Sequence, residues 1–380
     1  MRSSVFAVLP MTLAVALSAC TSTATSQPIK KPVAPTQTAQ PDKPVVALVL
    51  SGGGTRGFAH IGVIDALHQH GIRPNLVVGT SAGAMVGAIY ASGKTPAELT
   101  ELAKTLEPTD LIDITPSKQG LVDGNKLRQY INKQVKNQPI ERLPIRFAAV
   151  ATETQTRTAK AFTTGETGLA VQASASVAKL FVAPRIPENH GKKYQDGSST
   201  ALLPARIAKS LGADVIIAVD VMANAKSKQS TAENKQARTI SIDKTEQGIS
   251  AKWGEQTIDI PLDLSGLEQA SKDLPFNLPL GEIIGGVLGS IPKNTTFELP
   301  TDLPTSVDDV YRIVGDVASN QQADPADVAV STVVIRPDTA ILGITPDERH
   351  RLIQAGKDST NAQIDAIKQA IATAQYTPVK

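Results

Sequence analysis

The chain has 380 residues, 41% of them hydrophobic, and its 38 basic and 36 acidic residues give a formal net charge of +2 at pH 7. This near-neutral balance and an aromatic content of only 3% argue against a nucleic-acid-binding protein, which needs a basic surface and stacking side chains. The length allows one large domain or two smaller ones, with enough apolar residues for a sizeable core.

The N-terminal segment has the pattern of a secretory signal. Met1 and Arg2 give a short basic start, and Val5–Ala16 is a mostly apolar run that is too short for a comfortable membrane-spanning helix. Cys20 follows in the sequence Leu-Ser-Ala-Cys, and as the one cysteine of the chain it allows no intrachain disulfide. This tetrapeptide resembles the bacterial lipobox, although an ordinary signal peptide with an incidental cysteine is the alternative. The resemblance implies a signal peptide over 1–19 and a lipid anchor on Cys20.

Residues 20–44 are rich in Ser, Thr, Pro and Gln and lack apolar periodicity, which indicates a flexible tether. The residue after Cys20 is Thr21 and not an aspartate, and in this the chain resembles lipoproteins that are sorted to the outer membrane. We therefore expect a protein of the bacterial cell envelope, lipid-anchored to the outer membrane and facing the periplasm.

The globular part is expected from residue 45 to residue 380 and begins with alternating strands and helices. Val45–Leu50 is a continuous apolar run typical of a strand buried on both faces, and Phe58–His70 has apolar residues at helical spacing. Leu76–Val78 predicts a second strand that leads into a helix of small residues. Further strands are predicted at Ile145–Thr152, Ala159–Thr163, Val215–Val221 and Ser331–Arg336, and further helices near Asn125–Gln134 and Leu169–Leu180, from Thr95 and Thr345, and over Ser359–Ala374. This alternation predicts an α/β fold with a mainly parallel sheet.

Residues 224–310 differ in character and are interpreted as an insertion. The alternation in Gln256–Leu264 predicts a small hairpin. Leu274–Ile291 is apolar enough to line a lid or touch a membrane, and an ordinary buried loop is the alternative.

The glycine-rich loop after the first strand has two possible functions. Gly52, Gly54 and Gly57 fit the G-x-G-x-x-G pattern of a dinucleotide-binding turn. That function requires an acidic residue about twenty positions later, at the end of the second strand. The second strand ends Leu-Val-Val-Gly without an acid, and Asp65 lies in the preceding helix instead. The sequence therefore predicts no nucleotide cofactor.

A second motif favours acyl chemistry for the same loop. Gly79-Thr80-Ser81-Ala82-Gly83 is a G-x-S-x-G sequence between a predicted strand and a predicted helix, where small neighbours allow the sharp turn that exposes a serine nucleophile. The loops after the first two strands open on the same edge of the sheet. The backbone amides of Gly52, Gly53 and Gly54 are therefore expected to form an oxyanion hole beside Ser81.

Three ordered blocks resemble the patatin-like phospholipase family: Gly52–Gly57, Gly79–Gly83 and Asp196-Gly197-Ser198. The resemblance covers roughly Val45 to Val221 and resumes at Ser331. Ser198 stands where the family usually has Gly or Ala, and the block Ala173–Pro184 (ASASVAKLFVAP) lacks the family's proline at Ala178. The resemblance implies a three-layer α/β/α fold and a catalytic dyad of Ser81 and Asp196 without a histidine.

Other residues offer weaker alternatives. His190 precedes Asp196 closely and is the most credible member of a Ser-His-Asp triad, whereas His60 is expected to pack or to hydrogen-bond within its helix. Arg56 is a candidate for substrate binding, with hydrogen bonds to loop carbonyls as the equal alternative. No spacing of histidines or carboxylates indicates a metal site.

The sequence thus predicts a serine hydrolase without cofactor that cleaves carboxylic ester bonds of phospholipids or lysophospholipids in a membrane. A general esterase or thioesterase and a non-catalytic lipid-binding lipoprotein on the same fold are the alternatives. Headgroup preference, acyl position and oligomeric state are left open.

Overall fold

The computed structural model describes the chain over residues 43–117, 120–224, 239–244, 248–253, 256–261, 295–298, 310, 314, 321–340 and 345–375. The signal peptide, Cys20 and the segment Leu274–Ile291 lie outside these residues, as does almost all of the expected linker. No helix within the described ranges is long and apolar enough to cross a membrane.

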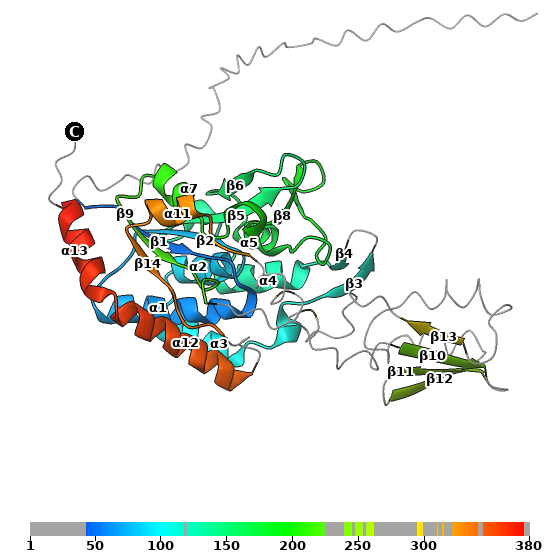
Figure 1. The fold of residues 1–380 in the computed structure, drawn as a ribbon. Coiled ribbons are helices and arrows are strands. Elements are labelled where there is room, and N and C mark those ends of the chain that lie inside the picture. Colours follow the sequence, from blue (N-terminus) through cyan, green and yellow to red (C-terminus); the bar gives the residue numbers. More distant parts are fainter. Residues whose placement is uncertain are drawn as a thin grey trace, which may run out of the picture. The chain divides into compact units, whose positions relative to one another are not determined.

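Strands and helices alternate through most of the described chain (Figure 1). The strands are β1 (Val46–Leu50), β2 (Leu76–Thr80), β3 (Ile114–Ser117), β4 (Gly120–Val122), β5 (Arg146–Glu153), β6 (Ala159–Phe162), β7 (Arg185–Ile186), β8 (Lys192–Asp196), β9 (Val215–Val219), β10 (Thr239–Lys244), β11 (Gly248–Trp253), β12 (Gln256–Pro261), β13 (Thr295–Glu298) and β14 (Val333–Ile335). The α-helices are α1 (Phe58–Gln69), α2 (Ala82–Ala91), α3 (Pro96–Thr105), α4 (Asn125–Gln134), α5 (Thr167–Ala175), α6 (Ser198–Ala201), α7 (Ala205–Ser210), α11 (Pro325–Val330), α12 (Pro346–Asn361) and α13 (Ile364–Gln375). The 3-10 helices are η1 (Gly54–Gly57), η2 (Pro108–Asp110) and η3 (Ile140–Arg142).

The large sheet has the strand order β14-β9-β1-β2-β5-β8-β7, with β6 also paired to β5. The pairs from β14 to β5 are parallel, whereas β6 and β8 run antiparallel to β5. Leu50 at the end of β1 lies beside Gly79 of β2 and beside Val219 of β9. The carboxyl ends of these strands therefore meet at one edge, which is where ligands bind in sheets of this kind. The predicted α/β fold with a mainly parallel sheet is confirmed.

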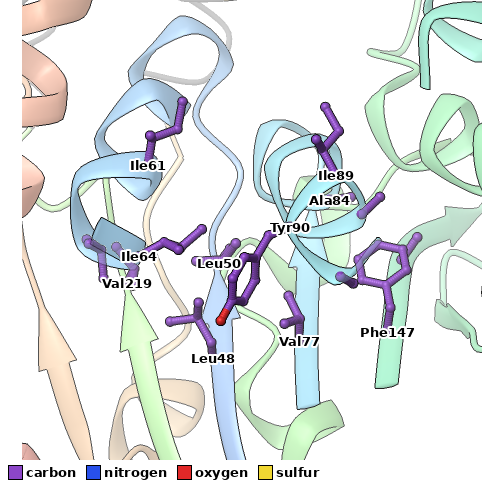
Figure 2. Close-up of a cluster of buried hydrophobic side chains, with 14 of the residues drawn as sticks. Leu48, Leu50, Ile61, Ile64, Val77, Ala84, Ile89, Tyr90, Phe147 and Val219 are labelled. Carbon is purple, nitrogen blue, oxygen red and sulfur yellow. The ribbon is translucent and has the colours of Figure 1, made fainter. Parts of the chain in front are cut away.

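Both faces of this sheet are buried, which explains why the central strands β1 and β9 are apolar without interruption. On one face Leu48, Leu50 and Val77 pack against α1 and α2 (Figure 2). On the other face Val49 and Val78 pack against α7 and α11. Figure 1 shows α1, α3 and α12 on the first side of the sheet and α7 and α11 on the second. Each fully buried Leu or Val side chain contributes about 1.5–3 kcal/mol, so the two apolar faces fix the three layers.

Several predicted element boundaries are confirmed and two are wrong. The helices predicted from Thr95 and Thr345 both begin there with a capping box. The helix predicted to reach Leu180 ends at Ala175, because the carbonyls of Ser174 and Ser176 accept from amides at the end of β8 and directly after it instead of continuing the helix. The predicted C-terminal helix is divided between α12 and α13, and the side chain of Gln363 at the break donates to the carbonyl of Val334 in β14 (3.3 Å).

The insertion contributes a small antiparallel sheet with the order β12-β11-β10-β13. The alternating stretch that was predicted to form a hairpin by itself is the single strand β12, which pairs with β11. The prediction of β structure here is confirmed, and β12 pairs with β11, which precedes it in the chain.

Candidate active site

Ser81 lies between the end of β2 and the start of α2 in a strained backbone conformation. Its φ of 52° and ψ of −119° are unusual for a residue with a side chain. A Cβ on Gly79 would lie 2.4 Å from the carbonyl oxygen of Gly83, and a Cβ on Gly83 would lie 2.3 Å from that of Leu50. Both positions therefore require glycine, and the tight turn holds Ser81 at the N-terminus of α2, whose dipole stabilises negative charge.

The hydroxyl of Ser81 binds Asp196 directly. Ser81 Oγ donates to Asp196 Oδ2 at 2.6 Å, and each residue is only 6% exposed. Asp196 is the last residue of β8, which the pairing with β5 brings to the same edge of the sheet. The two residues that the sequence predicts to form the dyad, 115 positions apart, are thus in hydrogen-bond contact.

The other oxygen of Asp196 is held by the following turn. The backbone N–H of Ser198 donates to Asp196 Oδ1 at 2.7 Å, and Thr152 Oγ1 donates to the Asp196 carbonyl at 2.9 Å. Burial raises the pKa of the Asp196 carboxyl above its ordinary value, and the hydrogen bonds from Ser81 and Ser198 oppose that rise. A carboxylate with a raised pKa is a stronger base than a solvated aspartate, as proton abstraction from a hydroxyl requires.

Sequence reasoning missed the role of Ser174 at the end of α5. The backbone N–H of Ser81 donates to Ser174 Oγ at 2.8 Å, and Ser174 Oγ donates in turn to the carbonyl of Val150 at 2.5 Å. The carbonyls of Ser174 and Ser176 accept from the amides of Gly197 and Asp196. One short segment therefore holds both members of the pair. The serine-rich sequence ASAS was the available signal, but it did not indicate a partner 93 positions away.

The glycine loop offers two candidate oxyanion donors instead of the predicted three. The N–H of Gly52 donates to the carbonyl of Leu202 at 3.0 Å and is not free to bind a substrate. The carbonyl of Gly53 accepts from the amide of Arg56 at 3.2 Å. Within the described part of the chain the N–H groups of Gly53 and Gly54 have no acceptor, so these two amides remain as the candidates.

Arg56 is held by the protein. Its side chain is 2% exposed, and its Nε donates to the carbonyl of Thr339 at 3.1 Å. Thr339 Oγ1 donates to the carbonyl of Val221, which links the glycine loop to the segments after β9 and β14. Of the two roles that the sequence leaves open, the geometry favours the bond to a loop carbonyl over substrate binding.

The histidines lie apart from the Ser81 hydroxyl. His190 is exposed in the loop before β8, and no imidazole stands between Ser81 and Asp196. His60 is fully buried in α1 and contacts the carbonyl of Ser51, next to the glycine loop. Among the residues with described positions, no group of three His, Cys, Asp or Glu could hold a metal ion.

An apolar pocket of about 150 Å³ opens beside Ser81. Successive turns of α2 line it with Ala82, Met85, Val86 and Ile89. Its other walls come from η1, α1, α3, α4, the end of α5, α12 and connecting segments. The residues are Gly54, Thr55, Gly57, Phe58, Ile61, Leu99, Leu102, Ala103, Leu106, Pro108, Leu111, Ile112, Leu127, Tyr130, Ala175, Phe181, Val310, Val314 and Arg349. A pocket of this kind, next to a serine hydroxyl, suits a hydrocarbon chain attached to the reacting group.

The part of the chain that contains this site is similar to known proteins. The patatin-like phospholipase family matches residues 48–209. Patatin-like phospholipase domain-containing protein 6 of Mus musculus is 34% identical over 184 residues, which are 46% of this chain and 13% of that protein. An uncharacterized NTE family protein of Mycobacterium bovis is 35% identical over 181 residues, which are 47% of this chain and 49% of that protein. The chain thus spans half or less of the length of these curated relatives.

Among solved structures, VipD from Legionella pneumophila aligns with 87% of this chain and 67% of its own, at 14% identity and a TM-score of 0.47. The family match begins within β1, contains the glycine loop, Ser81 and Asp196, and ends within α7. Over residues 48–209, the chain is therefore similar to the patatin-like phospholipase family.

Proposed function

We propose that this protein is a serine acyl hydrolase that cleaves carboxylic ester bonds of phospholipids or lysophospholipids. The observation that carries the proposal is the 2.6 Å hydrogen bond from Ser81 Oγ to the buried Asp196 carboxylate. The apolar pocket beside Ser81 supports a substrate with a long acyl chain.

The proposed reaction has two steps. Asp196 Oδ2 accepts the proton of Ser81 Oγ as that oxygen attacks the ester carbonyl, and the oxyanion binds the amides of Gly53 and Gly54. The intermediate collapses, the proton passes from Asp196 to the leaving alcohol, and the acyl group stays on Ser81. Water then attacks the acyl-Ser81 ester while Asp196 accepts its proton. The intermediate collapses, the proton passes from Asp196 to the leaving Ser81 Oγ, and the fatty acid is released with both residues restored.

The decisive experiment compares the wild type with Ser81→Ala on a mixed membrane-lipid extract, with the products identified by mass spectrometry. We expect free fatty acids and lysolipids from the wild type and none above background from Ser81→Ala. Ser92→Ala, at the other end of α2, is the matched control and should behave as the wild type, because Ser92 Oγ binds only the carbonyl of Ile89. Hydrolysis by Ser81→Ala, or labelling of another residue by a fluorophosphonate probe, would overturn the proposal.

The preference for lipids is tested separately from the chemistry. The rates on p-nitrophenyl butyrate and on phosphatidylcholine or lysophosphatidylcholine vesicles distinguish a lipid hydrolase from a general esterase or thioesterase. Faster turnover of the vesicles per accessible ester supports the proposal. Tight vesicle binding with no turnover of either substrate would indicate a binding protein.

We further propose that the protein is attached to the bacterial outer membrane through a lipid on Cys20. The Leu-Ser-Ala-Cys sequence, the apolar run before it and the polar tether after it support this attachment.

A further inference from the structure

The peptide unit that enters the glycine loop is held at both ends. The carbonyl of Ser51 and the N–H of Gly52 belong to one planar peptide group. That carbonyl lies 2.9 Å from His60 Nε2, and that N–H donates to the carbonyl of Leu202 at 3.0 Å. Ser51 is itself tied to the end of β9, since its N–H donates to Val219 and its Oγ accepts from the N–H of Val221. The plane of this peptide is therefore fixed by contacts from α1, from the α6–α7 connection and from β9.

The surroundings of His60 settle which of its nitrogens carries the hydrogen. The side chain is completely buried, and burial lowers the pKa of the imidazole to about 4, so it is neutral near pH 7. A carbonyl oxygen only accepts hydrogen bonds, so Nε2 bears the hydrogen and donates it to Ser51. Nδ1 then has no hydrogen, and it is buried without a hydrogen-bond partner among the described residues. A buried polar atom left without a partner has a cost, so packing alone does not account for a histidine at this position.

The peptide group that follows carries a candidate oxyanion donor. The N–H of Gly53 belongs to the unit between Gly52 and Gly53, and its direction depends on the backbone angles of Gly52. A glycine fixes these angles poorly by itself. A fixed peptide plane immediately before Gly52 limits the directions that the Gly53 N–H can take.

We propose that His60 is a positioning residue for the oxyanion-binding loop, which it holds through the hydrogen bond from Nε2 to the Ser51 carbonyl. This inference rests on the proposed hydrolase function. His60 does not touch the substrate, and it acts through the Ser51–Gly52 peptide. Small displacements of a reacting group or an oxyanion donor reduce rates by about 10²-fold, so the effect should appear in kcat.

The test replaces His60 with side chains that keep or remove the donor. Gln places an N–H near the position of Nε2, Met fills a similar volume without a donor, and Asn is polar but too short to reach Ser51. On p-nitrophenyl butyrate we expect His60→Met and His60→Asn to lower kcat by about 10- to 100-fold with KM within about twofold. His60→Gln should recover most of this loss. His68→Met is the matched control in the same helix and should keep the wild-type kcat, since His68 binds Tyr90.

Hydrogen exchange provides a readout that does not depend on activity. Amides of residues 51–57 should exchange faster in His60→Met than in His60→Gln or the wild type, with each variant compared at the same interval below its own melting temperature. A folded Met or Asn variant with the wild-type kcat would overturn the inference, as would a Gln variant that is as slow as Met. If the wild type does not hydrolyse esters, or if Ser81→Ala still does, the proposed function fails. An active wild type with an equally active His60→Met contradicts only the role of His60.

Discussion

Asp196 is the residue on which the proposed chemistry depends most, because it must be ionised to accept a proton. Burial raises its pKa, so it remains protonated to a higher pH than an ordinary aspartate does. We therefore expect kcat/KM to fall on the acid side with an apparent pKa above the ordinary value of 3.8. Asp196→Asn should lower kcat by about 10³-fold at neutral pH, because the amide cannot accept the proton. A pH–rate profile on a soluble ester measures both effects.

The variant Ser198→Ala tests the environment of the carboxyl group. It keeps the backbone N–H that binds Asp196 Oδ1 and removes only the hydroxyl, whose bond lowers the pKa of Asp196. The acid limb of its profile should therefore move to higher pH. An acid limb that is the same in both proteins would show that another group controls it.

His60 should also make the stability depend on pH. Its pKa is 6.5 when exposed and about 4 in the folded protein, so the unfolded chain binds more protons between these values. The wild type should thus lose up to about 3 kcal/mol of unfolding free energy as the pH falls from 6.5 towards 4. His60→Gln has no group that titrates at this position, so its unfolding free energy should not fall for this reason. In urea titrations at several pH values, its stability relative to the wild type should rise as the pH falls, and a constant difference would contradict the assignment.

Side chains of the site differ in how far the sequence could predict them. Ser81 and Asp196 stand in short motifs whose neighbours are constrained by the turn or by the family, so the sequence could predict this pair, and the structure places the two side chains in contact. The hydroxyl of Ser174 accepts from the amide of Ser81, and the backbone carbonyl of Leu202 accepts from the amide of Gly52. Neither contact has a recognisable pattern in the sequence. For the same reason, the sequence could not show that the Gly52 amide donates to Leu202 and is not free to be an oxyanion donor.

Helix α5 holds the backbone of Ser81 through Ser174, and replacing Ser174 tests this contribution of the helix. Ser174→Ala leaves the buried N–H of Ser81 and the carbonyl of Val150 without this partner. We expect a loss of about 1–3 kcal/mol in unfolding free energy and a lower kcat, because the strained backbone of Ser81 loses an anchor. Urea unfolding and steady-state kinetics measure the two effects. Ser176→Ala is the control, because its Oγ binds the carbonyl of Gln172 and does not contact Ser81.

Helix α2 sets the depth of the apolar pocket. Ser81 and Ile89 both line it, and they are separated by about 12 Å along the helix axis. Ile89→Trp should shorten the pocket, and each methylene that is excluded should cost about 0.8 kcal/mol, or roughly fourfold in kcat/KM. Long-chain p-nitrophenyl esters should therefore lose rate relative to the butyrate ester. Ile89→Ala should raise the rate on long-chain esters relative to the butyrate ester. If Ile89→Trp lowered the rate equally for all chain lengths, the pocket would not be binding the acyl chain.

Element prediction succeeded where one physical signal dominated. Strands buried on both faces are apolar throughout, and capping boxes mark the starts of α3 and α12. The end of α5 was missed because it depends on the end of β8 and the residue after it. The amides of Asp196 and Gly197 donate there to the carbonyls of Ser176 and Ser174. That competition arises only in the folded chain.

At the scale of the whole molecule, the order of the strands brings the residues of the candidate site together at one edge of the sheet. Because β9, β1, β2 and β5 are neighbours and parallel, the segments after them open on one edge of the sheet. The antiparallel β8 then ends beside Ser81 with Asp196 as its last residue. The alternation of strands and helices predicted the parallel sheet, but the antiparallel direction of β8 follows from tertiary pairing and had no signal in the sequence.

A lipid anchor would decide which substrates the whole molecule meets. Each methylene of an acyl chain contributes about 0.8 kcal/mol of membrane binding, so the several chains of a lipoprotein would hold the enzyme at the bilayer. Tethering would also raise the local concentration of lipid esters around the pocket. We expect the wild type to incorporate an alkyne-bearing palmitate when it is expressed in a bacterium, and Cys20→Ser to incorporate none.

The consequence for activity is tested with a variant in which residues 1–20 are replaced by a cleavable secretory signal. This protein should leave the membrane fraction, keep its kcat/KM on p-nitrophenyl butyrate within about twofold, and hydrolyse envelope lipids more slowly, because only the second reaction depends on tethering. Ser81→Ala should give the opposite pattern, with normal lipidation and no hydrolysis. Label on Cys20→Ser, or undiminished lipid hydrolysis by the released protein, would contradict the anchored arrangement.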